Sequence, residues 1–369
     1  VVVIDDNVAF SGGLDLTNRR WDTCEHRGDD PRRTCNGEPY PPFHDVMAVV
    51  DGAAAKSLGD LTRERWYLAT DEVIPTLGVG ADAWPEDVMP ELQDTTVAIS
   101  RTSPPSEARA AVREVEELYL DMIRAARRCI YIENQYFTSY KLAQLLEERL
   151  SEKDGPEVIL VLRLLSHGWL EEHTMEVVRT ELIKHLRKAD KHQRLGIYYP
   201  HVPGLKEGTC VDIHSKVMVV DEEWARVGSA NLCNRSMGLD TECDLTMEAA
   251  GDPAVMKVIG GFRDRLLAEH LDVTPDRIED AVRKTGSAVQ AIESLQTGQR
   301  SLRSLQDVKE WPDSVVELAA LADPDKPPVS VESLMEHIAP AQPKKSAPRH
   351  WRALVASVVA LAALTALWR

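Results

Sequence analysis

The sequence predicts an α/β fold made of two similar halves, in which helices cover mixed β-sheets. Two observations favour it: strand and helix periods alternate along the middle of the chain, and one strand-and-turn segment occurs twice. The chain has 369 residues, of which 43% are hydrophobic and 28% are charged. These values are ordinary for a globular protein and allow either two domains or one large two-layer domain.

The first predicted element is a strand at residues 1–4, which read Val-Val-Val-Ile. Two aspartates and then a Gly-Gly pair follow, so we expect a buried strand that leads into a tight turn. Apolar spacing of three and four predicts an amphipathic helix at 106–128, with Ser106 as its candidate N-cap. The alternation that follows is typical of an α/β sheet covered by helices. It consists of strand 129–137, helix 140–153, strand 157–166, helix 174–192, strand 195–200 and strand 210–221.

The residues at 217–221 repeat the opening of the chain. In both segments four apolar residues precede an aspartate, and a glycine lies seven positions after the aspartate, at Gly12 and Gly228. The two copies are 216 residues apart at every matched position. We therefore predict that each half of the chain contains the same strand-and-turn unit.

The end of the chain carries the pattern of a membrane segment. Residues 353–368 contain no charge, and the basic residues Lys344, Lys345, Arg349 and Arg352 lie just upstream. This run is shorter than the ~20 residues that span a bilayer. Tryptophan at both ends and the upstream basic residues nevertheless favour the start of a transmembrane helix, with the large domain on the cytoplasmic side. The alternative is a short buried helix.

These patterns predict four regions, bounded where the strand and helix periods change and where proline becomes frequent. The first half of the repeat is present in part, as residues 1–105, and the second half comprises residues 106–270. A helical and proline-rich linker follows at 271–350, and the start of a transmembrane segment at 351–369.

Composition excludes some classes of function. The formal net charge of -17 argues against a general nucleic-acid binder, because such proteins usually present a basic surface. The six cysteines are scattered without a CxxC pair, so we expect reduced thiols, although Cys24 and Cys35 could in principle pair. No histidine spacing typical of a metal site is present, and we predict neither a metal nor a cofactor.

The second copy of the repeat carries residues with phosphoryl chemistry. In an extended strand, His214 and Lys216 project from the same face. An imidazole there can attack phosphorus or carry a proton, and the lysine can neutralise charge on the phosphoryl oxygens. Asp221 closes the strand, and Ser229 and Asn231 lie beyond a glycine that lets the backbone turn closely. The joint pattern predicts a phosphoryl-transfer site.

This pattern, HxKxxxxD followed by GSxN, resembles the signature of the phospholipase D superfamily, also called the HKD family. The stretches 10–23, 41–58, 131–139 and 228–245 resemble the larger, eukaryotic-type phospholipases D in particular. The resemblance implies a two-lobed phospholipase D-like fold with pseudo-twofold related halves. It further implies that two motifs, one from each half, meet at one active site. One histidine then forms a phosphohistidine, while the other protonates the departing alcohol and activates water.

The resemblance also implies site residues. Glu242 matches the acid that follows the second motif, and Asp22 is its proposed counterpart in the first half. His44 and Asp45 match a family motif that reads WHD, with phenylalanine replacing the tryptophan. The expected catalytic residues are His214, Lys216, Asp221, Glu242 and Asp5. The expected phosphate-binding or orienting residues are Ser229, Asn231, Gly12, Gly13, Asp22 and Gln135.

Counting back along the repeat places the counterparts of His214 and Lys216 before Val1. We therefore expect the sequence to be an internal piece of a longer protein that starts just after the first HxK and is inactive by itself. The resemblance implies that the longer protein is a membrane-associated enzyme. It would hydrolyse glycerophospholipids to phosphatidic acid and a head-group alcohol, or transfer the phosphatidyl group to another alcohol.

Three other readings remain open at this stage. Within the superfamily, the alternative is a cardiolipin synthase-like phosphatidyl transferase. A nuclease of the same superfamily is disfavoured by the acidic charge balance. A non-catalytic membrane protein that only binds lipid head groups would be expected to carry a decayed motif, whereas the second motif is complete.

Overall fold

A computed structural model describes the chain except for residues 77–83, 107–108, 166–168, 297, 307–322 and 325–369. Its centre is a mixed nine-stranded sheet. The parallel strands β9, β10 and β11 form one side of the sheet, and antiparallel hairpins form the other. The strand order is β16 (Ser301–Ser304), β11 (Leu195–His201), β10 (Glu157–Leu162), β9 (Cys129–Asn134), β13 (Val217–Val220), β14 (Trp224–Gly228), β15 (Glu242–Glu248), β7 (Val97–Ser103) and β8 (Val112–Arg113).

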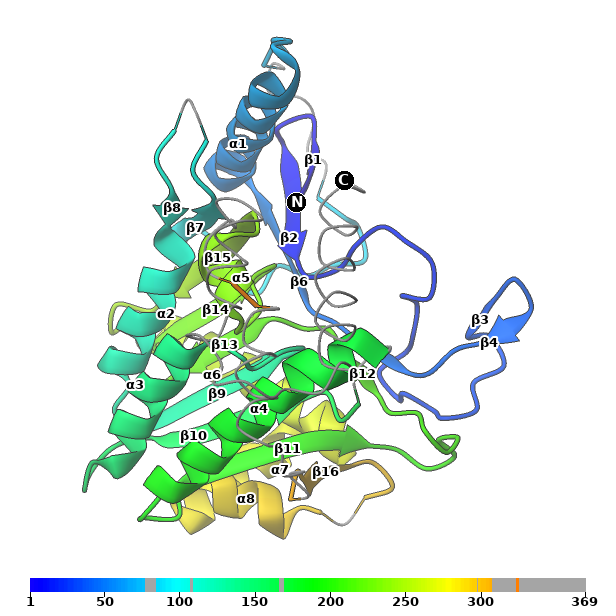
Figure 1. Ribbon diagram of the computed structural model, residues 1–369, viewed down its shortest axis with the longest axis vertical. Coiled ribbons are helices and arrows are strands. Elements are labelled where there is room, and N and C mark those ends of the chain that lie inside the picture. Colours follow the sequence, from blue (N-terminus) through cyan, green and yellow to red (C-terminus); the bar gives the residue numbers. More distant parts are fainter. Residues whose placement is uncertain (77–83, 107–108, 166–168, 297, 307–322, 325–369) are drawn as a thin grey trace, which may run out of the picture.

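Helices cover both faces of this sheet, as Figure 1 shows. One face packs against α2 (Glu114–Ala125), α3 (Tyr140–Ser151) and α4 (Trp169–Ala189) in a core that includes Ile130 and Met218. The other face packs against α6 (Pro253–Leu271), α7 (Pro275–Thr285) and α8 (Ala288–Ser294) in a core that includes Tyr131 and Val217. Neighbouring strand residues therefore belong to different cores, as the alternation of side chains requires. The predicted α/β class is confirmed.

A second, three-stranded sheet is formed by the N-terminal residues. It contains β1 (Val2–Ile4), β2 (Val8–Gly12) and β6 (Met47–Asp51), and α1 (Gly52–Thr70) follows it. Ala9, Ala55 and Leu58 pack against Cys243 and Leu245 of β15, so the small sheet lies on the large one through a core of its own. Between β2 and β6 the chain forms the short pair β3 (Thr34–Cys35) and β4 (Glu38–Pro39), then β5 (Phe43–His44).

The predicted repeat is present as two matching hairpins. Strand β1 pairs with β2 as β13 pairs with β14: Ile4 lies opposite Val8, and Val220 lies opposite Trp224. Each hairpin turns through two residues with positive φ, at 5–6 and at 221–222. Two such residues are typical of the tight turns whose twist matches that of the flanking strands. The third strand repeats as well, because β6 pairs with β2 as β15 pairs with β14.

Three local predictions are corrected by the structure. Strand β1 is an edge strand with Ile4 exposed, because the large sheet covers only one face of the small sheet. Ser106 forms an isolated bridge with Arg109 and does not cap α2, which begins at Glu114. The predicted strand 210–221 is divided into β12 (Asp212–Ile213) and β13, which belong to different sheets.

The predicted region boundaries also shift. Strand β7 precedes the predicted boundary at 105 but pairs with β15 in the large sheet. Residues after 270 do not form a linker at first, since α7 and α8 bury apolar side chains and β16 pairs with β11. The predicted transmembrane start at 351–369 lies outside the described residues. Among the helices that the structure describes, none combines the length and the apolar character that crossing a bilayer requires.

Strand β14 carries a buried charge that is matched within the sheet. The Arg226 guanidinium donates to both the carboxylate of Asp244 and backbone carbonyls, and both side chains are fully buried. We expect Asp244→Ala to lower the free energy of unfolding by about 3–5 kcal/mol, because it leaves a buried guanidinium unpaired. Urea denaturation measures the loss.

The matched control is Asp121→Ala, which breaks the exposed pair between Asp121 and Arg124 on α2. An exposed pair contributes less than about 1 kcal/mol. Equal losses in the two variants would show that burial of the Arg226 charge does not matter for stability.

Candidate active site

The site forms where two short strands, one from each half of the chain, pair with each other. Strand β5 pairs with β12 in parallel, with Ile213 beside His44. The next backbone amide continues this ladder, since His214 N–H donates to the carbonyl of His44 at 2.8 Å. The side chains that follow the ladder then meet: His214 Nδ1 lies 2.8 Å from a carboxylate oxygen of Asp45. The pairing of β5 with β12 thus fixes an imidazole against an acid 169 residues away.

The acid determines which ring nitrogen of His214 can react. A carboxylate accepts hydrogen bonds, so Nδ1 carries the proton that Asp45 binds. Among the residues that the structure describes, Nε2 of His214 has no hydrogen-bond partner, and the side chain is 14% exposed. The ring packs against Phe43, with ring centroids 5.4 Å apart. The imidazole is therefore oriented by an acid and an aromatic ring, with Nε2 as the nitrogen open to a substrate.

Lys216 is buried beside this imidazole. Its ammonium donates to the His214 carbonyl at 2.6 Å and to the side-chain oxygen of Gln135 at 3.2 Å. Burial lowers the pKa of Lys216 to about 8, although Asp45 and Glu242 favour the charged form. The lysine therefore stays mainly protonated at neutral pH and supplies a desolvated positive charge.

Gly13 lets the N-terminal segment approach this lysine. A Cβ at Gly13 would lie 2.6 Å from the Lys216 side chain and 2.9 Å from the His214 carbonyl oxygen. Gly12 is packed just as closely, against the backbone of Val46 and Met47. Gly13 is thus needed for close contact between the two halves, and Gly12 is needed for close contact of β2 with the backbone at Val46 and Met47 within the first half.

Glu242 lies at the start of β15 and is held by two hydroxyl groups. Ser229 donates to one carboxylate oxygen at 2.5 Å, and Ser236 of α5 (Asn234–Gly238) donates to the other at 2.6 Å. Burial raises the pKa of Glu242 to about 7. Asn231 begins the same turn, and its backbone N–H donates to Ser236. Ser229 and Asn231 therefore support the Glu242 carboxyl and form part of its surroundings.

The sheet register identifies the counterpart of Glu242, and it is not Asp22. Gly12 lies opposite Met47 as Gly228 lies opposite Asp244. Asp45 lies two residues before Met47, and Glu242 lies two residues before Asp244. Each half therefore contributes one acid at the same position, and in the first half this acid is the residue that binds His214.

Asp22 is instead buried in a network away from His214. It accepts from His26, from Arg33 and from the Phe43 backbone. These contacts fix the loop before β5, so Asp22 acts on the site only through the position of that strand. Asp45 is not among the site residues that we expect from the sequence, although the resemblance of its FHD stretch to WHD is a usable signal.

Asp221 and Asp5, which we expect from the sequence to be catalytic, lie in hairpin turns away from His214 and Lys216. Asp221 is at the far end of β13, and seven residues of extended chain correspond to roughly 20 Å. Its carboxylate accepts from three successive backbone amides, those of Arg127, Arg128 and Cys129. Asp5 occupies the equivalent turn of the first hairpin and is exposed. Both residues belong to the turns of the repeat.

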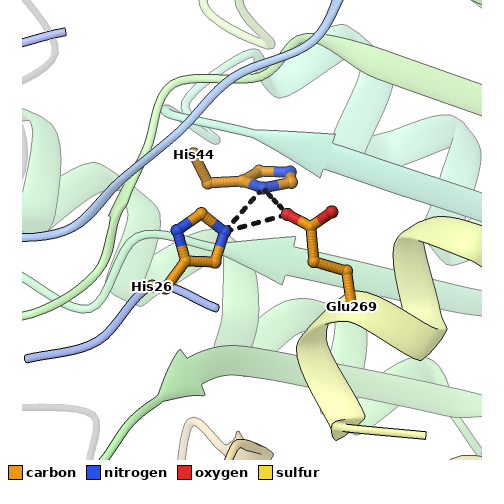
Figure 2. Close-up of side chains that lie close together, drawn as sticks. All are labelled: His26, His44 and Glu269. Atoms are coloured by element: carbon orange, nitrogen blue, oxygen red, sulfur yellow. Dashed lines mark hydrogen bonds and ion pairs between the residues drawn. The ribbon is translucent and has the colours of Figure 1, made fainter. Parts of the chain in front are cut away.

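A buried cluster behind the site contains groups that could hold a metal ion. Figure 2 shows His26, His44 and Glu269 converging from a loop, from β5 and from α6. Their facing atoms are 2.9, 3.1 and 3.3 Å apart. A tetrahedral divalent ion with bonds of about 2.0–2.1 Å holds its ligand atoms about 3.3 Å apart. The two contacts with Glu269 are shorter than this and have the lengths of hydrogen bonds. Among the described residues, His44, Glu133 and His270 form a second such group.

The ring nitrogens that face away from Glu269 are also held by acids. His26 Nδ1 lies 3.0 Å from Asp22, and His44 Nε2 lies 2.8 Å from Glu133. Such acids orient metal-bound imidazoles. Protonation of His44 also accounts for these contacts without a metal ion. Burial opposes the charged imidazole, but Glu133 and Glu269 raise the pKa of His44 to about 10. Sequence spacing does not reveal that these residues form one cluster, because they lie in segments that are far apart along the chain.

The role of Asp221 is open to a stability measurement. We expect Asp221→Ala to lower the free energy of unfolding by about 2–3 kcal/mol, since a charged acceptor for three backbone amides is lost. Thermal or urea denaturation checks this value. A variant as stable as the wild type would contradict the structural role.

The raised pKa of Glu242 predicts a pH effect on stability. Its folded-state pKa of about 7 lies above the value near 4.5 of a free glutamate, so folding favours the protonated form. Its contribution to stability is complete below about pH 4.5 and is lost as the pH rises through 7. We expect Glu242→Gln, which cannot ionise, to gain stability relative to the wild type between pH 5 and pH 8.

Urea midpoints at pH 5, 6, 7 and 8 test this expectation, with Glu86→Gln on an exposed loop as the control. The control should show the same difference from the wild type at every pH. A pH-independent difference for Glu242→Gln would contradict the assignment of this titration to Glu242.

Comparison with known proteins gives concordant matches. Residues 119–264 match the profile of a family described as "Cardiolipin synthase, PLD-like domain". Phospholipase D alpha 3 of Arabidopsis thaliana is 24% identical over 415 residues, which cover 80% of this chain and 50% of that protein. Cardiolipin synthase A of Pseudomonas aeruginosa (strain LESB58) is 26% identical over 278 residues, which cover 75% and 47%. The chain thus spans half or less of the length of these relatives.

Solved structures give a weaker match. A phosphatidylserine synthase from Haemophilus influenzae Rd KW20 aligns with a TM-score of 0.38 at 14% identity, over 73% of this chain and 54% of that one. The family profile spans β9, β13 and β15, and the alignments with the longer relatives extend over most of the chain. Residues 119–264 are thus similar to a PLD-like domain, and most of the chain is similar to phospholipases D and cardiolipin synthases.

Proposed function

We propose that the protein containing this chain hydrolyses the head-group phosphodiester of glycerophospholipids by phospholipase D chemistry. The observation that carries the proposal is the His214 imidazole, which Asp45 orients beside the buried Lys216 ammonium. An oriented proton carrier next to a desolvated cation suits a phosphodiester, whose leaving alcohol needs a proton and whose oxygens gain charge during transfer. The relatives named phospholipase D support the same reaction class.

His214 has the role of acid and then base in this scheme. Its Nε2 delivers a proton to the oxygen of the departing head-group alcohol as the phosphorus–oxygen bond breaks. In the second step the neutral imidazole takes a proton from water, which attacks the phosphorus of the covalent intermediate. Asp45 accepts from Nδ1 in both steps and stabilises the imidazolium form.

The remaining groups hold the phosphoryl oxygens and the other imidazole. Lys216 neutralises charge on the oxygens, and Gln135 keeps its ammonium in place. The family resemblance assigns the attack on phosphorus to a histidine of the other motif copy. Glu242, as the register counterpart of Asp45, is the acid suited to orient that histidine.

A second candidate is phosphatidyl transfer of the cardiolipin synthase type. It is favoured by the description of the matching family and by the Pseudomonas relatives. The two reactions share the covalent step and differ only in whether water or an alcohol resolves the intermediate. Incubation with phosphatidylglycerol as the only lipid distinguishes them, because a transferase forms cardiolipin and glycerol, whereas a hydrolase forms phosphatidic acid and glycerol.

We also propose that the protein acts at a membrane, with this domain on the cytoplasmic side. The support is the charge-free run at 353–368 with basic residues upstream, which lies outside the described residues. Anionic lipids attract each basic residue near the surface by about 1 kcal/mol.

The proposed activity is tested with the full-length protein that contains this chain and with phosphatidylcholine vesicles. The wild type should release choline and phosphatidic acid, and added ethanol should divert part of the product to phosphatidylethanol. His214→Ala should lower kcat by at least about a thousandfold while retaining the fold, because the proton carrier is lost. Choline release and lipid chromatography measure both products.

The control is His185→Ala, which removes an exposed histidine of α4. It should retain the wild-type rate. Wild-type rates in the His214→Ala variant would remove this motif from the mechanism, and a wild type inactive on every phospholipid would remove the proposed function.

A further inference from the structure

Glu133 is a fully buried carboxylate that receives four hydrogen bonds. One oxygen, Oε2, accepts from the Ser215 hydroxyl at 2.7 Å and lies 2.8 Å from His44 Nε2. The other oxygen, Oε1, accepts from the Tyr131 hydroxyl at 2.5 Å and lies 2.9 Å from His270 Nε2. The Glu133 carboxylate therefore has all four neighbours within hydrogen-bond distance and can hold each of them in place.

The two donors on Oε2 are the chain neighbours of the reactive pair. Ser215 immediately follows His214, and His44 immediately precedes Asp45. Since side chains alternate along an extended chain, Ser215 and His44 point away from the side to which His214 and Asp45 point. Oε2 of Glu133 thus contacts both chain segments on the side opposite the site. It does so at Ser215 and His44, the residues next to His214 and Asp45.

The two donors on Oε1 lie elsewhere. Tyr131 comes from the same strand as Glu133, and His270 comes from α6. Neither is adjacent in the chain to a reactive residue. Oε2 therefore contacts the segments that carry His214 and Asp45, whereas Oε1 contacts β9 and α6. Variants can remove the contacts of each oxygen separately.

We propose that Glu133 is a positioning residue that, through Ser215 and His44, fixes the distance between His214 and Asp45. The inference rests on the proposed function. It adds to that function a buried acid that does not contact the substrate but keeps His214 in the position from which it delivers the proton. Loss of the Oε2 contacts lets β5 and β12 shift relative to each other, and His214 then presents Nε2 to the leaving oxygen less often.

This role predicts a dependence on the leaving group. An alkyl alcohol such as choline needs the proton from His214, whereas nitrophenolate leaves without one. Ser215→Ala should therefore lower kcat on phosphatidylcholine by about tenfold or more with little change in KM. The same variant should lose no more than about threefold in the first-turnover release of nitrophenolate from a p-nitrophenyl phosphodiester, because that step needs no proton from His214.

Tyr131→Phe is the matched control, because it removes one hydroxyl donor from the same carboxylate on the side away from the site. Its kcat should stay within about twofold of the wild type on both substrates, while its thermal midpoint falls about as much as that of Ser215→Ala. Comparable thermal midpoints ensure that differences in rate do not come from unfolding.

Two results would overturn the inference. Either Ser215→Ala loses the same factor on both substrates, or Tyr131→Phe lowers kcat as much as Ser215→Ala does. In both cases Glu133 only stabilises the fold. A wild type that hydrolyses neither substrate rejects the proposed function itself and is thus distinguishable from these results.

Discussion

The parallel pairing of β5 with β12 is the contact on which the site depends. It is only two residues long on each side, yet its continuation brings the His44 carbonyl to the His214 amide and the Asp45 carboxylate to the His214 ring. Two short strands have few backbone hydrogen bonds of their own to hold their register. Side chains therefore have to hold it, which explains why so many buried polar groups lie behind this part of the protein.

Those groups form a continuous network of acids and imidazoles from Asp22 to Glu133. Each buried charge in it has an opposite charge or several donors within hydrogen-bond distance, as the low dielectric of an interior requires. The ion pair between Arg226 and Asp244 follows the same rule within the large sheet. The network joins the loop before β5, the end of β9 and α6, so the N-terminal segment is fixed to the second half by polar contacts at the site and by the small apolar core around Leu58.

The repeat explains why one site contains two acids with different behaviour. Asp45 and Glu242 occupy equivalent positions of equivalent strands, but only Asp45 has an imidazole beside it among the described residues. Glu242 is surrounded by serine hydroxyls and by burial, which raises its pKa to about 7. Similar backbone geometry therefore places the two acids in different surroundings, with an imidazole beside Asp45 and serine hydroxyls beside Glu242.

The sequence by itself determined the alternation of strands and helices, the repeat and its tight turns, and the residues His214 and Lys216, because these are local patterns or fixed spacings. It could not place Asp221, which has the right spacing but lies at the wrong end of a strand. It also chose Asp22 over Asp45, and it could not reveal the cluster around Glu133. Which acid meets which imidazole was decided by tertiary structure alone, since it depends on the register between strands more than 160 residues apart, and sequence spacing does not encode that register.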